Sequence, residues 1–258
     1  MTELMAELMA TGQETLWVAG IVFLRVGAAM FLLPAFGERL VPARIRLVLA
    51  LAFTAIVAPA VGPMVAPLAT GEAGMVRLIA TEAIAGLTIG LMLRLFVMAL
   101  QIAGTIAAQA TSLSQILGDA GIDPQPAIGQ LLTIGGLTLA VLADLHVRLA
   151  EFIIHSYDIL PAGIFPGAAL IGEWGIERIA AAFAMAFSLA APFTIASFVY
   201  NLALGVINRA MPQLMVSFVG APAITLGGLA LLLLAAPLML GLWQQSFLDF
   251  IADPAGGR

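Results

Sequence analysis

Residues 213–248, QLMVSFVGAPAITLGGLALLLLAAPLMLGLWQQSFL, contain no charged side chain. A helix of this length exceeds the ~20 residues that cross the hydrocarbon core of a bilayer. The preceding stretch, 179–208, is also uncharged, and only the short break Arg209-Ala-Met-Pro212 separates the two. Pro212 suits the first turn of a new helix. The two stretches therefore predict a long helical hairpin in a membrane protein.

The composition of the whole chain points to the same class. Of its 258 residues, 62% are hydrophobic and 10% are charged, whereas soluble domains have about 45–50% and about 25%. This excludes an ordinary soluble enzyme, a disordered chain and a nucleic-acid-binding module. The absence of Cys excludes disulfides, thiol catalysis and Cys-ligated metal. We therefore expect an all-α integral membrane protein.

Charges and breaks divide the chain into about six long hydrophobic helices. Ahead of the hairpin, the apolar stretches are 16–36, 47–69, one from about residue 77 to 118, and one from about residue 125 into the 150s. We expect the Gly- and Pro-rich residues 158–175 to be irregular. These stretches leave no room for a separate soluble domain.

Seven ionisable residues lie inside apolar stretches, where a charge is costly and usually faces protein or water. They are Arg25, Glu82, Arg94, Asp144, His146, Arg148 and Glu151. One interpretation is a path for protons or ions. The other, which we favour, is pairing between helices or placement near an interface, where a long side chain reaches water.

The spacing of these residues along the sequence does not match that of a catalytic or metal-binding group. On a helix, Asp144 and His146 point about 200° apart, whereas Asp144 and Arg148 can pair. The sequence has no metal-ligand spacing and no paired carboxylates. We therefore expect no catalytic site, no metal site and no cofactor.

The segment 109–126 is small, polar and Gly-containing, and it lies between two apolar stretches. One interpretation is a plain loop outside the bilayer. The other is a loop that fills or closes a pore, because irregular backbone at membrane depth is tolerated only inside protein or along a water-filled cavity. The candidate plug or gate residues are Gln109, Thr111, Ser112, Ser114, Gln115, Gly118, Asp119, Gly121, Asp123 and Pro124.

Several motifs together resemble one known family. In order they are Arg25-Val-Gly27, Pro34-Ala-Phe36-Gly37, Pro42-Ala-Arg44-Ile-Arg46, Glu82 with Gly86-x-x-x-Gly90, Asp144-Leu-His146, Leu160-Pro161-Ala-Gly163, and Asn201-Leu-Ala-Leu-Gly205-Val-Ile-Asn208-Arg209-Ala-Met-Pro212-Gln213. The last run is the most specific. With these motifs the sequence resembles the FliR family of flagellar biosynthesis proteins, whose counterpart in injectisomes is the SctT family.

The resemblance implies a single membrane domain over residues 1–258. Within it, residues 15–172 would form a FliP-like helical part, residues 175–250 a FliQ-like hairpin, and residues 109–125 the family's plug loop. We expect the listed motif residues to serve packing and assembly. In particular, we expect Gly205 to allow close packing of the hairpin, so that leucine at this position disrupts it.

The resemblance also implies a function. The chain would be a non-enzymatic subunit of the type III export gate in the bacterial inner membrane, at the flagellar basal body, and unfolded rod, hook and filament proteins would pass through that gate. The implied partners are FliP and FliQ, with FlhB and FlhA nearby, and membrane lipid, but no nucleic acid. Two alternatives stay open: an injectisome subunit, and a proton-coupled secondary transporter that uses Glu82 or Asp144.

Overall fold

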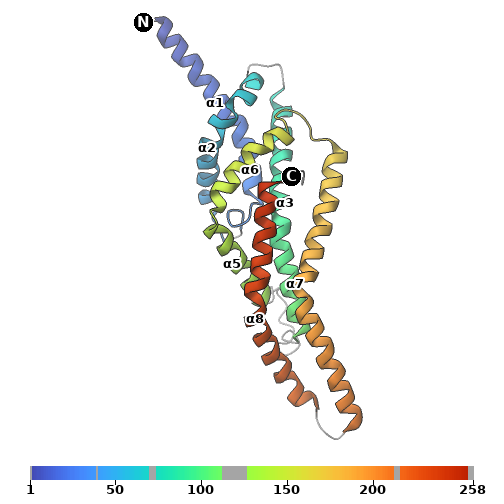
Figure 1. Cartoon of the computed structure of the whole chain (residues 1–258). Coiled ribbons are helices and arrows are strands. Elements are labelled where there is room, and N and C mark those ends of the chain that lie inside the picture. The colour runs from blue at the N-terminus through green and yellow to red at the C-terminus, as the bar shows by residue number, and fades with distance from the viewer. Residues whose placement is uncertain (1, 39, 70–73, 112–126, 212–215, 255–258) are drawn as a thin grey trace. The chain divides into compact units, whose positions relative to one another are not determined.

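The computed structural model describes residues 2–38, 40–69, 74–111, 127–211 and 216–254, and these form helices with no strand among them. The helices are α1 (Thr2–Met30), α2 (Ala43–Ala69), α3 (Met75–Ala110), α5 (Ala127–Leu142), α6 (Leu145–Ile159), α7 (Ala168–Ala210) and α8 (Val216–Ala252) (Figure 1). Within these ranges, α2, α3, α7 and α8 are long and apolar enough to cross a membrane, and the bent pair α5–α6 is a fifth candidate span. The predicted all-α membrane class is confirmed.

The chain folds into two compact units. Unit 1 comprises residues 1–95, 141–178 and 249–258, and unit 2 comprises residues 96–140 and 179–248. The long helices α3, α7 and α8 each contribute residues to both units. The division into FliP-like and FliQ-like sub-parts stays a prediction.

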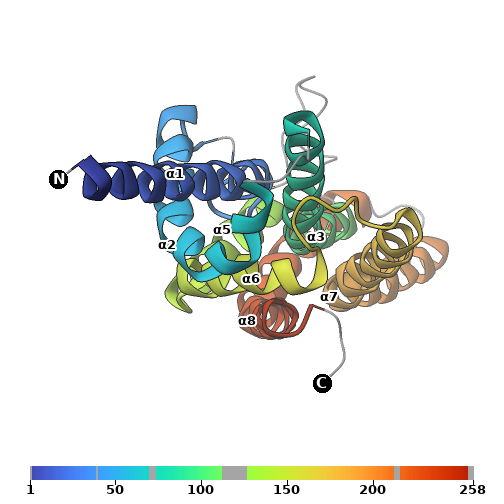
Figure 2. The same ribbon diagram turned by 90° about the horizontal axis from the view of Figure 1, so that it is seen from above.

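In unit 1, α1 lies against α2, and α2 also contacts α6. Figures 1 and 2 both show α1 and α2 side by side. Branched and other apolar side chains fill the space between the helices; Val22, Val26 and Leu33 are fully buried. This core supplies the rigid frame in which the buried polar residues described below are held.

Unit 2 contains the C-terminal part of α3 and most of α5, α7 and α8. Trp243 on α8 is fully buried, and its ring stacks on Phe247 at 5.0 Å between centroids. Its Nε1 donates to the Phe96 carbonyl at 2.8 Å. A Cβ atom at Gly136 would lie 3.2 Å from this indole ring, so Gly136 makes room for it.

The prediction that the apolar stretch from about residue 125 into the 150s forms one helix is wrong. Asp144 takes the left-handed conformation, with φ 59° and ψ 39°, and separates α5 from α6. Asp tolerates this conformation better than most residues, because its short polar side chain can bond locally. Arg148 does not pair with Asp144; its Nε donates instead to the Ala143 carbonyl at 3.0 Å.

The expected irregular region is also shorter than residues 158–175. Helix α6 continues to Ile159, and α7 already begins at Ala168. A Gly-Pro cluster predicts a break, but it does not define how many residues the break takes.

Candidate functional site: the buried ionic network and the outward-facing motif

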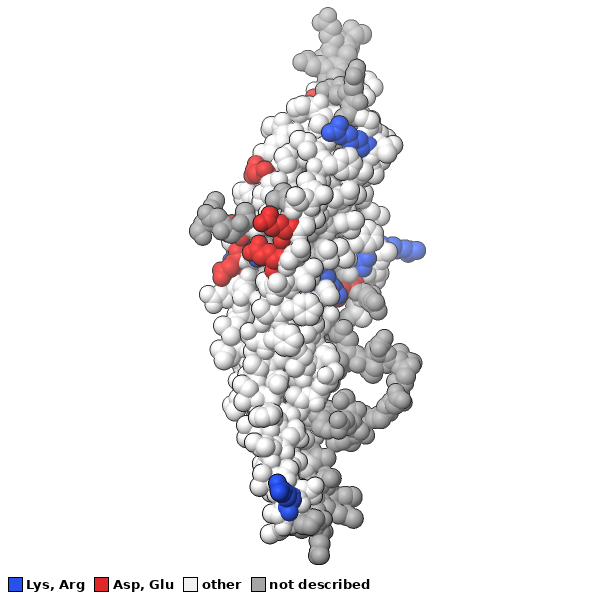
Figure 3. All heavy atoms as spheres, turned by 90° about the vertical axis from the view of Figure 1, so that its right-hand side faces the viewer, with Lys and Arg blue, Asp and Glu red and all other residues white. Residues whose placement is uncertain are grey.

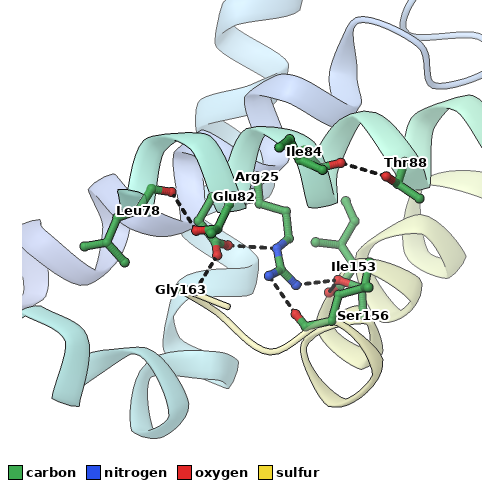
Figure 4. A network of polar contacts seen from close by, with 10 residues as sticks. Arg25, Leu78, Glu82, Ile84, Thr88, Ile153, Ser156 and Gly163 are labelled. Carbon is green, nitrogen blue, oxygen red and sulfur yellow. Dashed lines mark hydrogen bonds and ion pairs between the residues drawn. The ribbon is translucent and has the colours of Figure 1, made fainter. Parts of the chain in front are cut away.

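Arg25 on α1 is the centre of a polar network inside unit 1 (Figure 4). Its side chain and that of Glu82 on α3 are both fully buried, and Arg25 Nε donates to Glu82 Oε2 at 2.9 Å. Its Nη1 donates to Ser156 Oγ at 3.2 Å, and its Nη2 donates to the Leu160 carbonyl at 2.8 Å. Every nitrogen of the guanidinium therefore has an acceptor.

Glu82 and Ser156 have partners for their remaining polar atoms as well. The second carboxylate oxygen of Glu82 accepts the Gly163 N–H at 3.0 Å. The Ser156 hydroxyl donates to the Ile153 carbonyl at 2.6 Å. The guanidinium also lies over the Tyr157 ring, 3.7 Å from its centroid, where a cation is attracted to the aromatic face. The network thus joins α1, α3, α6 and the segment that follows α6.

Glycines allow the helices to come close enough for this pair to form. A Cβ at Gly86 would lie 2.2 Å from the Arg25 carbonyl oxygen, and one at Gly90 would lie 2.8 Å from the Ala29 carbonyl oxygen. The Gly86-x-x-x-Gly90 motif is therefore used inside the chain, between α1 and α3. Gly163 has φ +72°, a conformation in which side chains are disfavoured, and Leu78 and Leu68 crowd its Cβ position.

The network supports pairing between helices for Arg25 and Glu82. Removing one partner of a buried ion pair costs about 3–5 kcal/mol, because the other charge stays buried without compensation. Asp144, His146 and Glu151 are exposed instead, and they take no part in this network. Of the two carboxylates considered for proton coupling, Glu82 is therefore buried in an ion pair and Asp144 is exposed.

A second ionic contact holds the loop between α1 and α2. Arg94 Nη1 bonds the Glu38 carboxylate, and Arg46 Nη2 donates to the carbonyls of Glu38 at 3.2 Å and Val41 at 3.3 Å. A Cβ at Gly37 would lie 2.7 Å from the Phe31 carbonyl oxygen. The motif residues of this region thus make a tight, internally bonded loop.

The remaining motif residues of this region divide by exposure. Pro34 is buried, and the half-buried Phe36 packs edge-on against Phe53 at 5.7 Å between ring centroids. Pro42 and Arg44 are exposed. Pro161, in the segment after α6, is exposed as well.

The most specific motif lies on α7 in unit 2 and faces outward. Asn201, Gly205, Asn208 and Arg209 are all exposed, and a Cβ at Gly205 would have no atom within 4 Å. The prediction that Gly205 packs the hairpin is therefore wrong. The hairpin is held elsewhere, for example where the Tyr200 hydroxyl donates to the Gly220 carbonyl at 2.6 Å. Pro212 and Gln213 lie outside the described residues.

Large apolar side chains share this outward face of α7. Ile195, Phe198, Leu202 and Val206 recur at helical spacing and are 61–69% exposed. We call these four residues the α7 stripe. The sequence of unit 2 contains three charged residues, Asp119, Asp123 and Arg209. In Figure 3 the described atoms at the lower end, where α7 and α8 approach their connection, are white apart from one basic side chain.

Two plug candidates are among the described residues. Thr111 is buried, and its hydroxyl donates to the Ala107 carbonyl at 3.0 Å; Gly228 on α8 lies against its side chain. Gln109 is exposed. The other candidates lie outside the described residues: Ser112, Ser114, Gln115, Gly118, Asp119, Gly121, Asp123 and Pro124. The plug therefore stays a prediction.

Sequence reasoning did not single out the roles of Tyr157, Trp243 and the Gly104–Gly129 contact. Tyr157 follows Ser156 on the buried face of α6, and its place against Arg25 depends on how α1 and α6 pack, which no local pattern indicates. A Cβ at Gly104 would lie 2.2 Å from the Gly129 Cα, but a chain with 26 glycines does not reveal which two meet. Among the residues that the structure describes, no three His, Asp or Glu side chains gather into a group able to hold a metal ion.

These features define a multi-pass helical membrane protein with a buried ion pair in one unit and an apolar outer face in the other. The sequence model of the family described as bacterial export proteins, family 1, matches residues 16–250, and the chain belongs to this family. The resemblance to FliR is thereby confirmed.

Individual relatives give the same result. The chain is similar to flagellar biosynthetic protein FliR of Caulobacter vibrioides, with 34% identity over 91% of this chain and 94% of that protein. FliR of Aquifex aeolicus is 30% identical over 93% of each chain. FliR of Escherichia coli is 26% identical over 87% of this chain and 86% of that protein.

Proposed function

We propose that this chain is the FliR-type subunit of the flagellar protein export gate, a non-enzymatic membrane component through which unfolded flagellar proteins leave the cytoplasm. The observation that carries the proposal is the similarity to proteins named FliR over more than nine-tenths of the chain. The names of these relatives favour the flagellar system over an injectisome. The site of action would be the inner membrane at the flagellar basal body.

The structure supports a role in assembly. An apolar stripe beside exposed Asn and Gly residues is the kind of surface that membrane helices use to pack against each other. We propose that helices of FliP and FliQ cover the α7 stripe, with FlhB and FlhA nearby. The Arg25–Glu82 network would keep unit 1 in a fixed conformation while partners bind.

The experiment is a deletion with complementation, combined with purification. Deleting the gene should abolish swarming, and the wild-type gene should restore it. The tagged chain should co-purify from detergent with FliP- and FliQ-type subunits. Normal swarming after the deletion, or purification of the chain as a stable homo-oligomer without partners, would contradict the proposal. The second result would favour a transporter.

The plug forms a separate part of the proposal. We propose that residues 109–125 block the pore of the idle gate, because a small polar segment can fill a lumen without breaking a helix core. Deleting residues 111–121 should raise ion conductance through the assembled gate. Unchanged conductance, with normal complex yield, would count against a plug at this position.

A further inference from the structure

Unit 1 contains an open groove between α1 and α2, with a volume of about 500 Å³. Its walls include Glu14 and Val18 on α1, and Ala55, Pro59, Gly62 and Pro63 on α2. We call this feature the α1–α2 groove. Its volume is within the range of about 300–1,000 Å³ that is usual for ligand pockets. The groove takes no part in the Arg25 network and contains none of the family-motif residues.

Small residues form the α2 wall at helical spacing. Residues 55, 59 and 63 follow one another four apart, and Gly62 lies beside them on the same face. A Cβ at Gly62 would meet no atom within 4 Å. The groove is therefore open. Side chains four apart form a ridge of a helix, and where these side chains are small the ridge is low, so that a second helix can approach. Small residues at such contacts allow close approach in membranes.

Prolines change the hydrogen bonding of this wall. Pro59 and Pro63 have no N–H, so the carbonyls of Ala55 and Pro59 lack their regular donors four residues later in the helix. Backbone acceptors without donors are costly in a membrane. An occupant that supplies hydrogen-bond donors along this wall would be stabilised relative to one that supplies none.

The charge of the groove further restricts the chemistry of its occupant. Glu14 is exposed at the α1 wall, and none of the residues that line the groove is basic. The groove thus offers acceptors and negative charge. A lipid acyl chain provides neither donors nor positive charge, and it would leave these acceptors unsatisfied.

We infer that the α1–α2 groove receives a helix of another subunit, which presents small hydroxyl- or amide-bearing side chains to the α2 wall and an Arg or Lys to Glu14. This inference rests on the proposed function, because it requires that the chain assembles with other helical membrane subunits. It adds a second surface, distinct from the α7 stripe, and the chemistry of the helix that binds there.

The test fills the groove without disturbing the fold. Gly62→Leu places a large side chain in open space, whereas Gly20→Leu is a matched control. Gly20 is also a glycine with no atom within 4 Å of its Cβ position, but it points about 200° away from Val18 on α1. Both variants should keep the unfolding midpoint of the solubilised chain. Gly62→Leu should lower the yield of co-purified FliP- and FliQ-type subunits ~10-fold or more, and Gly20→Leu should leave it unchanged.

Substitutions at Gly62 and Glu14 test separately whether the groove is covered in the complex and whether Glu14 faces a positive charge. Since the natural chain has no Cys, Gly62→Cys introduces the only thiol of the chain, which should react with a maleimide in the chain alone and be protected in the assembled complex. Glu14→Arg should lower the complex yield more than Glu14→Gln does, because it adds repulsion to the lost ion pair.

The outcomes are separable. If the wild-type chain assembles and Gly62→Leu assembles equally well, or if the thiol at position 62 reacts equally in the complex, the groove inference is wrong. It is also wrong if Gly62→Leu displaces co-purified phospholipid and leaves the subunits bound, since lipid is then the occupant. If the wild-type chain itself binds no subunits, the proposed function fails.

Discussion

The two units of this chain use charge in opposite ways. Unit 1 contains a fully buried Arg–Glu pair whose polar atoms all have partners inside the unit. Unit 2 has almost no charge and is held by glycine contacts and a buried indole. Its specific motif is exposed. Arg25, Glu82, Gly86 and Gly90 are thus motif residues that are used inside unit 1, whereas the motif residues on α7 are exposed and, under the proposed function, would contact other subunits.

The comparison also explains the composition. A membrane protein of 62% hydrophobic residues has more apolar surface than its own core needs. In unit 1, α1 and α2 pack against each other. In unit 2 the side chains of the α7 stripe are 61–69% exposed, and this apolar surface is left for lipid or partner helices to cover.

The largest expected effect comes from breaking the buried pair. Arg25→Leu should lower the free energy of unfolding by about 3–5 kcal/mol, because Glu82 is left buried and charged. Titration of the solubilised chain with denaturant measures this change. The control in unit 2 is Arg209→Leu, an exposed change that should stay within about 0.5 kcal/mol.

The double variant Arg25→Leu/Glu82→Leu sharpens this test. It removes both charges, so part of the lost stability should return. If Arg25→Leu and Arg209→Leu had equally small effects, the buried network would not be the feature that distinguishes unit 1.

The next largest effect on the free energy of unfolding is expected at Gly86, and Gly205 serves as its comparison. Gly86→Leu forces atoms into the Arg25 backbone and should lower the free energy of unfolding by about 1–3 kcal/mol or more. Gly205→Leu has open space and should change it by less than about 1 kcal/mol, in the stabilising direction, because leucine is the better helix former. Thermal unfolding of the two variants side by side measures the contrast; equal destabilisation would mean that Gly205 is packed.

A smaller effect is expected within unit 2. Trp243→Phe removes the N–H that donates to the Phe96 carbonyl and should cost about 1–3 kcal/mol. The matched control is Trp17→Phe, since Trp17 on α1 is 43% exposed. Denaturant titration should separate the two variants, and a change at Trp17 as large as that at Trp243 would contradict the packing described for unit 2.

The smallest effect concerns backbone strain in unit 1. Ala35 has φ 66°, which costs a residue with a Cβ about 1–2 kcal/mol. Ala35→Gly should therefore raise the unfolding midpoint, corresponding to up to about 1 kcal/mol. Ala180→Gly, in the exposed part of α7, should lower it by about 0.5–1 kcal/mol. Changes of the same sign in both variants would argue against strain at Ala35.

The sequence predicts the helical membrane class and the family because long uncharged stretches and the Asn201–Gln213 run are local patterns. The sequence also predicts that Arg25 and Glu82, which lie in apolar stretches, serve packing between helices. It does not predict that they pair with each other, because 57 residues separate them and several other ionisable residues lie in apolar stretches. The bend at Asp144 was missed because a single left-handed residue leaves the hydrophobic pattern on both sides unchanged. The role of Gly205 was misjudged because a glycine pattern does not tell an internal contact from an external one.

The central claim is that unit 2 completes its packing on other subunits. The most direct measurement compares Gly205→Leu with the wild-type chain in two assays, thermal unfolding of the isolated chain and co-purification of FliP- and FliQ-type subunits. We predict an unfolding midpoint at or slightly above that of the wild type, together with a loss of at least about tenfold in complex yield. Normal complex yield with an unchanged midpoint would contradict the claim.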